Sequence, residues 1–358
     1  MASNLELEAL SAAEDRTSFL ASFAELPGRV RDDAHRVGLA APGATLFLMN
    51  AGLTEVREAW LARAEGRVVG RVHANVSWTN PELGYIGFYE VDLGVADHDA
   101  VAKALLDAAS QWLAARGVRN VYGPIDWCTT FSYRLLLPRQ GKSKDSRLHT
   151  WEPVTPPAFL DHWNAAGFEV AEHYHSRATN AAPVDYAARR EPSPTPAKAR
   201  AEALGFTFRP LAPIERIDED FEALHHVNSL GFADNFLFEP IPFPMYCALT
   251  RTIAGKSPYH YSSWVHAPDG EPAGYIYTFR DEGVVVRKTV AIIPKYRGAK
   301  LSSALFQICT AESCRDGIVE GVFALIREGN ISDKVTTNTS EDPTDLWRHD
   351  YVLFGKKL

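Results

Sequence analysis

One stretch in the last quarter of the chain combines residue types that together can bind an anion. Val284 to Ile293 is an almost continuous apolar and β-branched run, which is typical of a buried strand. Pro294 ends the run because proline cannot donate to a sheet ladder. Beyond Gly298, four apolar residues recur at helical spacing: Leu301, Ala304, Leu305 and Ile308. A strand, a glycine turn and a helix N-terminus leave backbone N–H groups for an anion, and a phosphate-bearing ligand is the first candidate.

The order of residues around this turn resembles the GNAT superfamily of acetyl-CoA-dependent N-acyltransferases. Ile292 to Leu305 follows that family's sequence of a strand, Pro-x-Tyr-Arg-Gly and a helix. Arg297 stands at the first position of the family pattern Gln/Arg-x-x-Gly-x-Gly/Ala. Lys300 and Ser302 depart from the pattern, because small glycines are usual there. The resemblance implies acetyl-CoA or another acyl-CoA as the donor substrate.

The resemblance also implies which residues bind the donor. In the family, the strand before the turn separates from its neighbour and pairs with the pantetheine arm, while the turn holds the pyrophosphate. Residues 324–332 match the Ala-Leu-Met-x-x-x-Asn-x-Ser segment of a small GNAT subgroup. The positions that carry over as donor-binding are Val290, Ala291, Ile292, Arg297, Gly298, Ala299, Lys300, Leu301, Ser302, Asn330 and Ser332. Asn330 has a structural interpretation of equal weight, as the cap of the segment that follows it.

Proton transfer in GNAT enzymes often uses a tyrosine that protonates the departing thiolate. The resemblance makes Tyr351 the candidate acid, although a tyrosine in an apolar strand is also typical of a core. For the base, Glu239, His260 and Glu282 are all candidates. Glu239 is our choice because it lies in an aromatic and proline-rich segment, residues 232–246, expected to be a loop that lines an acceptor or acyl pocket.

Periodicity predicts alternating strands and helices along the chain. In the first half we expect a hairpin around Glu65 and Gly66, and Gly117 as the end of a helix. The expected strands are 45–50, 58–64, 67–76, 84–92, 118–123, 206–210, 259–265, 273–279, 284–293, 321–326 and 350–354. The expected helices are 99–116, 159–168, 218–230 and one from Gly298 to Gly317.

The two halves of the chain resemble each other. Glu65–Gly70 matches Asp269–Gly274 in its glycine interval, and Gly117 has its counterpart in Gly317. Chance similarity of two α/β segments is the alternative. Together with the family resemblance, this repeat predicts two tandem GNAT-like domains of mixed α/β class, at 1–180 and 205–358. Residues 181–204, rich in proline and alanine, are the predicted linker.

The first half also resembles bacterial GNAT-like proteins of unassigned role. Where its phosphate turn is expected, it has the acidic run from Asp92 to Asp99. Carboxylates there repel a pyrophosphate. We therefore expect the first domain to be a degenerate copy that binds no CoA.

Composition excludes several other classes of protein. The 358 residues are 46% hydrophobic and 23% charged, as in a globular protein, and a net charge of −8 argues against general nucleic-acid binding. The N-terminus lacks a signal peptide and no run of eighteen apolar residues exists, so we expect no membrane span.

Four cysteines without a Cys-x-x-Cys predict reduced thiols and a cytoplasmic protein. The pairs His173/His175 and His225/His226 lack a third ligand, so no metal is expected.

The resemblance to GNAT enzymes, together with these observations, implies an N-acyltransferase that moves an acetyl or longer acyl group from acyl-CoA to an amine. The acceptor is expected to be a small molecule or a peptide. An alternative keeps the fold but takes the acyl group from a carrier protein, a long-chain donor or an aminoacyl-tRNA. Another alternative is a non-catalytic GNAT-fold protein that binds a ligand or a protein partner.

Overall fold

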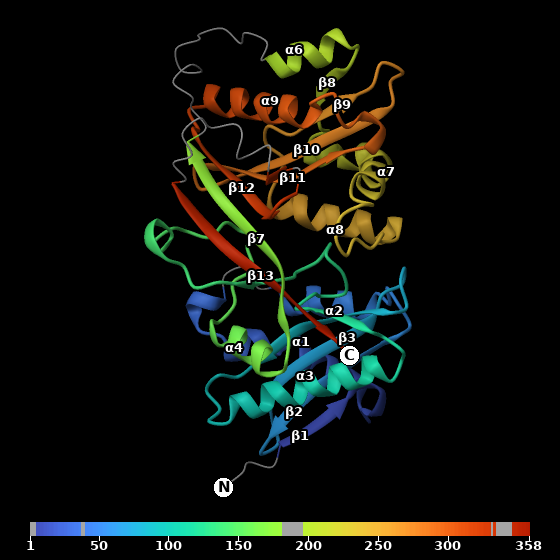
Figure 1. Ribbon diagram of the computed structural model, residues 1–358, viewed down its shortest axis with the longest axis vertical. Coiled ribbons are helices and arrows are strands. Elements are labelled where there is room, and N and C mark those ends of the chain that lie inside the picture. The colour runs from blue at the N-terminus through green and yellow to red at the C-terminus, as the bar shows by residue number, and fades with distance from the viewer. Residues whose placement is uncertain (1–4, 37–39, 181–195, 331, 334–345) are drawn as a thin grey trace. The chain divides into compact units, whose positions relative to one another are not determined.

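The computed structural model describes residues 5–36, 40–180, 196–330, 332–333 and 346–358 (Figure 1). The chain divides into two compact units. The first unit comprises Met1–Arg139, Thr150–Tyr174 and Asp350–Leu358, and the second comprises Gln140–His149 and His175–His349. Each unit has its own strands and helices.

The sheet of the first unit has four antiparallel strands followed by a parallel one. In spatial order these are β1 (Leu5–Ala9), β2 (Arg57–Ala64), β3 (Arg67–Val76), β4 (Leu83–Val91) and β5 (Asn120–Gly123). Glu65 and Gly66 connect β2 to β3, and both have positive φ, at 52° and 75°. This turn geometry matches the twist of hairpin strands, so the predicted hairpin is confirmed.

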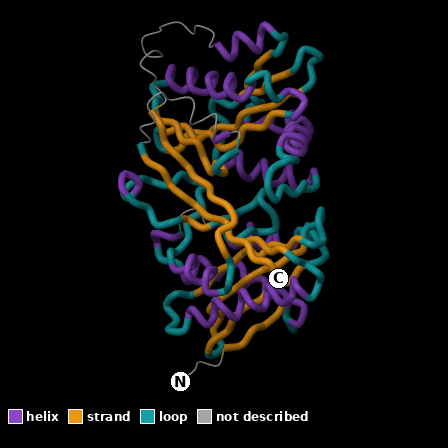
Figure 2. Tube along the Cα trace, in the orientation of Figure 1, coloured by secondary structure: helices purple, strands orange, loops and turns teal. Residues whose placement is uncertain are grey.

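Helices cover both faces of this sheet (Figure 2). The helices are α1 (Arg16–Val30), α2 (Pro42–Asn50), α3 (His98–Ala114) and α4 (Ala158–Ala165), with short 3-10 helices η1 (Leu10–Ala12) and η2 (Asp33–His35). Leu61 of β2 packs in the core beside α1, whereas its neighbour Trp60 packs in the core beside α3. Adjacent residues of a strand point to opposite faces, so one strand serves two cores.

The second unit repeats this arrangement. Its strands are β8 (Thr207–Pro210), β9 (Ser263–His266), β10 (Pro272–Asp281) and β11 (Val284–Ile292), which are antiparallel, and β12 (Glu320–Arg327), which is parallel to β11. Its helices are α6 (Pro196–Ala203), α7 (Phe221–Gly231), α8 (Phe243–Lys256) and α9 (Leu301–Arg315), with η3 (Gly141–Ser143), η4 (Ile214–Asp220) and η5 (Pro294–Tyr296). Gly117 and Gly317, both with positive φ, follow α3 and α9. The internal repeat read from the sequence is therefore present in the fold.

Each sheet is completed by a strand from the other half of the sequence. In the first unit, β5 pairs with β13 (Trp347–Lys357), whose residues Phe354–Lys357 lie opposite Gly123–Asn120. The short β6 (Leu135–Leu136) also pairs with β13. In the second unit, β12 neighbours β7 (Glu169–Asn180), of which residues 175–180 belong to that unit. The final strands are thus exchanged between the two halves of the chain.

Two expectations about local structure are wrong. Residues 45–50, expected as a strand, are the end of α2, which begins with Pro42 in its first turn. The expected loop at 232–246 ends earlier, because α8 begins at Phe243 after Pro242. A short apolar run has no period that separates helix from strand, which explains the first error. The predicted linker stays a prediction, since 181–195 lie outside the described residues; residues 196–203 form α6.

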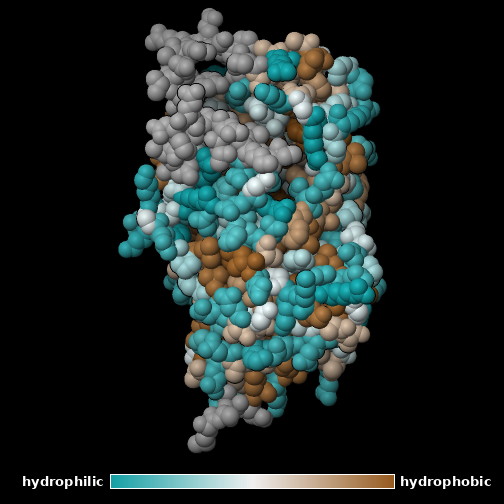
Figure 3. Space-filling view, in the orientation of Figure 1, coloured by the Kyte–Doolittle hydropathy of each residue, from teal (hydrophilic) through white to brown (hydrophobic). Residues whose placement is uncertain are grey.

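None of the helices in the described ranges has both the length and the apolar character needed to cross a bilayer. On the face of the molecule in Figure 3, hydrophilic residues predominate and hydrophobic ones occur in smaller groups between them.

Candidate functional site

The turn between β11 and α9 has a backbone suited to an anion. Gly298 has φ of +100°, and Lys300 is left-handed, with φ 56° and ψ 30°. Lys300 precedes the helix, and its side chain makes no capping hydrogen bond. The N–H groups of the first turn have no acceptors inside the helix, so they and the positive end of the helix dipole are available to an anion. The helix start expected near Gly298 is confirmed at Leu301.

The two departures from the family pattern preserve the shape of this turn. Lys300 adopts the conformation that glycine takes without strain, at a cost of roughly 1–2 kcal/mol for a residue with a side chain. Its exposed ammonium adds positive charge to the turn. Ser302 is half-buried in the first turn of α9. Ala299 and Leu301 pack against the core, so only their backbones can face a ligand.

Strand β11 separates from β12 just before this turn. Their parallel pairing comprises Val285 with Gly321, Val286 with Val322, and Arg287 with Phe323. It ends there, although β11 continues to Ile292 and β12 to Arg327. Leu325, with φ of 55°, interrupts the regular conformation of β12. The second half of β11 therefore pairs with β10 on one side, and on the other side Val290 and Ile292 have no strand partner among the described residues.

Val290 and Ile292 direct their main-chain polar groups to this unpaired edge. Ile293 donates its N–H to the carbonyl of Ala273, on the β10 side, at 2.9 Å. Successive residues of a strand alternate in direction, so Ala291 also faces β10. The carbonyl of Ala291 is close to Gly274, where an added Cβ would lie 2.4 Å from it. Val290 and Ile292 can therefore hydrogen-bond an extended ligand as a neighbouring strand would.

A cluster of polar side chains lies beside the open part of β11, on the face that α7 covers. Asn228 Nδ2 donates to the hydroxyls of Tyr246, at 2.6 Å, and Tyr275, at 2.9 Å. Tyr275 pairs with Ala291, and Gly231 of α7 lies so close to Ala291 that an added Cβ would be 3.3 Å from its Cβ. Sequence reasoning missed this cluster because its members come from α7, α8 and β10 and share no local pattern.

Both tyrosines of this cluster are held in the protonated form. Burial raises the pKa of Tyr275 to about 12. Burial also raises the pKa of Tyr246 well above its usual value. Tyr275 is buried and Tyr246 is half-buried. A phenol that keeps its proton at neutral pH can donate it to a leaving group.

Arg297 joins the turn to the end of α7. One guanidinium nitrogen, Nη1, pairs with Asp234 Oδ2 at 2.9 Å, and the other, Nη2, donates to the carbonyl of Gly231 at 2.8 Å. Its guanidinium therefore positions the turn against α7. This contact also offsets the negative end of the α7 dipole.

Asn330 forms the capping contact that was one of its two interpretations. Its Oδ1 accepts the N–H of Asp333 at 2.7 Å, and Asp333 in turn accepts the N–H of Gly329 at 2.9 Å. Ser332 lies in the same short segment and is half-buried. Both residues follow β12, which is separated from the second half of β11 by the gap that opens where the two strands stop pairing. Their contact with a donor stays a prediction.

The two predicted catalytic residues lie in different units. Tyr351 belongs to the first unit, where it is fully buried and pairs with Leu136. Glu239 belongs to the second unit, together with the turn, and is 1% exposed in the segment between α7 and α8. Their catalytic roles stay predictions.

The other two candidate bases have contacts of their own. The carboxylate of Glu282 pairs with Arg147 at 2.5 Å, in the connection that precedes β11, at the opposite end of this strand from the turn. His260 is half-buried, and its Nδ1 lies 3.0 Å from the carbonyl of Pro258.

The corresponding region of the first unit is filled by the chain itself. There β4 and β5 also share three parallel pairs, from Leu83–Asn120 to Tyr85–Tyr122. Beyond them, Ile125 donates its N–H to the carbonyl of Ile86 at 2.8 Å, and Asp126 accepts the N–H of Phe88 at 2.5 Å. Gly87 is packed so tightly that an added Cβ would lie 2.0 Å from the carbonyl oxygen of Ile125. The edge that is open in the second unit is therefore occupied in the first.

Neither histidine pair considered from the sequence forms a cluster. His173 belongs to the first unit and is exposed, whereas His175 belongs to the second and is buried. His225 Nε2 lies 3.0 Å from the carbonyl of Ile241, and His226 is exposed.

Known structures share this arrangement over nearly the whole chain. A tandem GNAT protein from the clavulanic acid biosynthesis pathway superposes with a TM-score of 0.54 at 14% identity, covering 99% of this chain and 98% of that one. The chain has the tandem GNAT fold. A probable N-acyltransferase of Enterococcus faecalis V583 gives 0.57 at 9% identity, over 99% of this chain and 73% of that one. A GCN5-related N-acetyltransferase of Kribbella flavida gives 0.52 at 11% identity, over 99% and 71%.

No family profile matches the sequence. No curated protein matches it by sequence comparison. At the identities of the structural matches, likeness extends to the GNAT fold, and activity has to be argued from the site.

Proposed function

We propose that the second unit is an N-acyltransferase that moves an acyl group from acyl-CoA to an amine. The observation that carries the proposal is the unpaired edge of β11, which runs directly into the uncapped N-terminus of α9. An extended arm can pair with the edge while the phosphates at its end meet the helix N-terminus. Acyl-CoA has this combination of a pantetheine arm and a pyrophosphate.

The chain's residues have distinct roles in this proposal. The backbones from Gly298 to Ser302 bind the pyrophosphate, and the exposed ammonium of Lys300 attracts it. Val290 and Ile292 hydrogen-bond the pantetheine arm and place the thioester beside Ala291. Asn330 and Ser332, at the end of β12, contact the same arm from the other side of the gap.

The reaction is a direct attack of the neutral amine on the thioester carbonyl. The nitrogen–carbon bond forms, the carbon–sulfur bond breaks, and the amine proton passes to a base. Glu239 is the proposed base, acting directly or through water. A tyrosine protonates the departing thiolate, and the candidates are Tyr351 from the sequence and Tyr246 from the structure. Of these two, Tyr246 lies in the same unit as the turn.

Ligand-dependent unfolding tests this function. Acetyl-CoA, a long-chain acyl-CoA and free CoA are added separately, and a ligand at 100 times its Kd stabilises the native state by about 2.7 kcal/mol. We expect at least one of them to raise the Tm. Ser302→Glu should abolish the rise, because a carboxylate in the first turn repels the pyrophosphate while it suits the helix dipole. Gln111→Glu, an exposed change of equal charge in α3, is the matched control.

Two outcomes would contradict the proposal. One is that no CoA species changes the Tm, and the other is that Ser302→Glu and Gln111→Glu respond alike. If acyl-CoA binds, thiol release with a panel of polyamines, amino acids and peptides identifies the acceptor class. Binding without release across the panel favours the ligand-binding alternative.

A further inference from the structure

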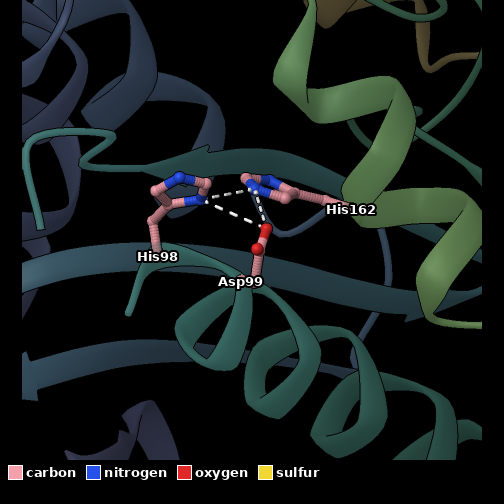
Figure 4. Close-up of side chains that lie close together, drawn as sticks. All are labelled: His98, Asp99 and His162. Carbon is pink, nitrogen blue, oxygen red and sulfur yellow. Dashed lines mark hydrogen bonds and ion pairs between the residues drawn. The ribbon is translucent and has the colours of Figure 1, made fainter. Parts of the chain in front are cut away.

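Three side chains of the first unit bring ligand atoms for a metal ion together. His98 and Asp99 are the first two residues of α3, and His162 lies in α4 (Figure 4). His98 Nδ1 is 3.1 Å from His162 Nε2, and Asp99 Oδ1 is 3.3 Å from each of these nitrogens. Among the described residues, these three form a group of His, Cys, Asp or Glu with every ligand atom within 4.8 Å of the others.

The size of this triangle matches one face of a tetrahedral zinc site. Zinc binds imidazole nitrogen at about 2.0–2.1 Å and carboxylate oxygen at about 2.0–2.2 Å, so tetrahedral ligand atoms lie about 3.3–3.5 Å apart. The observed separations of 3.1 to 3.3 Å are close to this value. A hydrogen bond between the two rings and ion pairs with Asp99 account for the single edges of the triangle, and one cation bound by all three atoms would account for the triangle as a whole.

The surroundings of His162 prepare its ring as a ligand. The hydroxyl of Tyr89 lies 2.8 Å from Nδ1, on the opposite side of the ring from the triangle. Metal-binding histidines almost always have such a partner on the second nitrogen, which fixes the tautomer and orients the ring. The His162 side chain is 1% exposed, and Phe159 stacks on it.

The other two ligands leave the site accessible from solvent. The side chain of His98 is 30% exposed and that of Asp99 is 82% exposed. An ion can therefore enter from water, and water can occupy the fourth position. The carboxylate of Asp99 lies at the site itself and attracts a cation, which opposes the repulsion of a cation by the helix N-terminus.

The cluster lies at the β4–α3 connection, the counterpart in the first unit of the β11–α9 turn. We propose that the first unit binds a zinc-type divalent metal ion through His98, Asp99 and His162. The ion joins the start of α3 to α4, which lies about sixty residues later in the chain. The β11–α9 turn is proposed to bind an anion in the second unit, whereas its counterpart before α3 is proposed to bind a cation in the first. This inference is independent of the proposed acyltransferase function.

Titration of the full chain with zinc chloride after chelator treatment tests the inference. We expect calorimetry to show one saturable site per chain and zinc to raise the Tm. Cobalt(II) provides a direct readout, since tetrahedral coordination by two imidazoles and a carboxylate gives intense visible absorption. Asp99→Ala should weaken zinc binding by more than about 100-fold, beyond the 10–100-fold typical of losing an outer partner such as Tyr89.

Asp97→Ala is the matched control. Asp97 is the N-cap residue of α3, makes no side-chain capping bond and is outside the triangle. His98→Ala provides a second ligand variant. It is preferred to a variant of His162 because His98 is partly exposed, whereas replacement of the buried His162 can prevent folding. Absence of a saturable site, or equal zinc affinity of Asp99→Ala and Asp97→Ala, would overturn the inference. Zinc binding by scattered surface histidines would give equal affinities for Asp99→Ala and Asp97→Ala.

Discussion

At the scale of single residues, the candidate site depends on backbone conformation more than on side-chain identity. Lys300 is left-handed where the GNAT pattern has glycine, and Gly298 has positive φ two residues earlier. Lysine thus replaces the usual glycine at position 300, but the left-handed backbone conformation of the turn is the same. The strained backbone thus lies at the turn for which we propose ligand binding, and ligand sites are a common place for such strain.

Lys300→Gly should separate stability from donor binding. Relief of the left-handed strain should exceed the added entropy of the unfolded chain, so we expect the free energy of unfolding to rise by about 0.5–1 kcal/mol. Loss of the ammonium should weaken acyl-CoA binding, and more so at low salt. Denaturant unfolding and calorimetry measure the two effects. Lys295→Gly, at a position without positive φ, should lower stability instead; equal effects at both positions would refute the argument.

The identity of the acid can be decided by comparing two tyrosines. Tyr246→Phe should slow CoA release by about 100-fold, with donor affinity little changed, because a general acid acts in the transition state. Burial raises the pKa of Tyr246, so the phenol stays protonated and its ionisation should cause no loss of rate between pH 7 and 9. Stopped-flow thiol detection measures the rate. If Tyr351→Phe slows release and Tyr246→Phe does not, the acid is the residue inferred from the sequence.

At the scale of elements, the exchange of final strands determines what each unit needs in order to fold. The first unit is closed by β13, which pairs with β5 and contributes the buried side chains of Tyr351, Val352, Leu353 and Phe354 to this unit. The second unit has β7 beside β12. A break at the midpoint of the sequence would therefore leave both halves without a strand. Such long-range pairing is formed late and slowly in folding.

Deletion of residues 350–358 should unfold the first unit. The four buried side chains of residues 351–354 each contribute roughly 1.5–3 kcal/mol, and their sum, with the lost ladder bonds, approaches the whole stability of a domain. Hydrogen exchange in β2 to β5 should lose its protection. Lys357→Ala, at an exposed position of the same strand, is the control and should leave exchange unchanged. Protected β2 to β5 amides in the deletion variant would contradict the importance of this strand.

At the scale of the whole molecule, the two units share one fold and differ at the strand edge beside the turn. In the second unit the edge of β11 is open and the turn is uncapped. In the first unit, Ile125 and Asp126 fill the same edge, and the turn carries carboxylates. Asp126, which occupies this edge, is enclosed by the protein, and its burial raises the pKa of its carboxyl to about 6. The degenerate character of the first unit is our proposal on these grounds.

The chain should therefore bind one acyl-CoA. Calorimetry with acetyl-CoA, or with the species that gives the largest Tm rise, should show a stoichiometry of one per chain, because within the described residues the second unit alone has an open strand edge beside an uncapped helix N-terminus. Ser302→Glu should remove that single site completely. A stoichiometry of two, or a residual site in the Ser302→Glu variant, would show that the first unit also binds the donor.

Short-range patterns in the sequence were enough to predict many elements of this fold. The run from Val284 to Gly298 predicted a strand, a turn and a helix start, because these signals lie within a few residues of one another. The repeat was predicted by comparing two such local patterns, each ending at a glycine, Gly117 or Gly317. The tandem GNAT fold was expected on those signals and is confirmed by the structural matches. Errors occurred where a short apolar run, such as 45–50, has no period of its own.

Only the tertiary structure decided which distant residues meet. The exchange of β7 and β13, the cluster of Asn228 with Tyr246 and Tyr275, and the triangle of His98, Asp99 and His162 all join segments separated by many residues. Such contacts leave no periodic trace in the chain, since their partners are brought together by packing and strand pairing. The anion turn could thus be found from its own residues. Its surroundings, and the different use of the same turn in the first unit, required the fold.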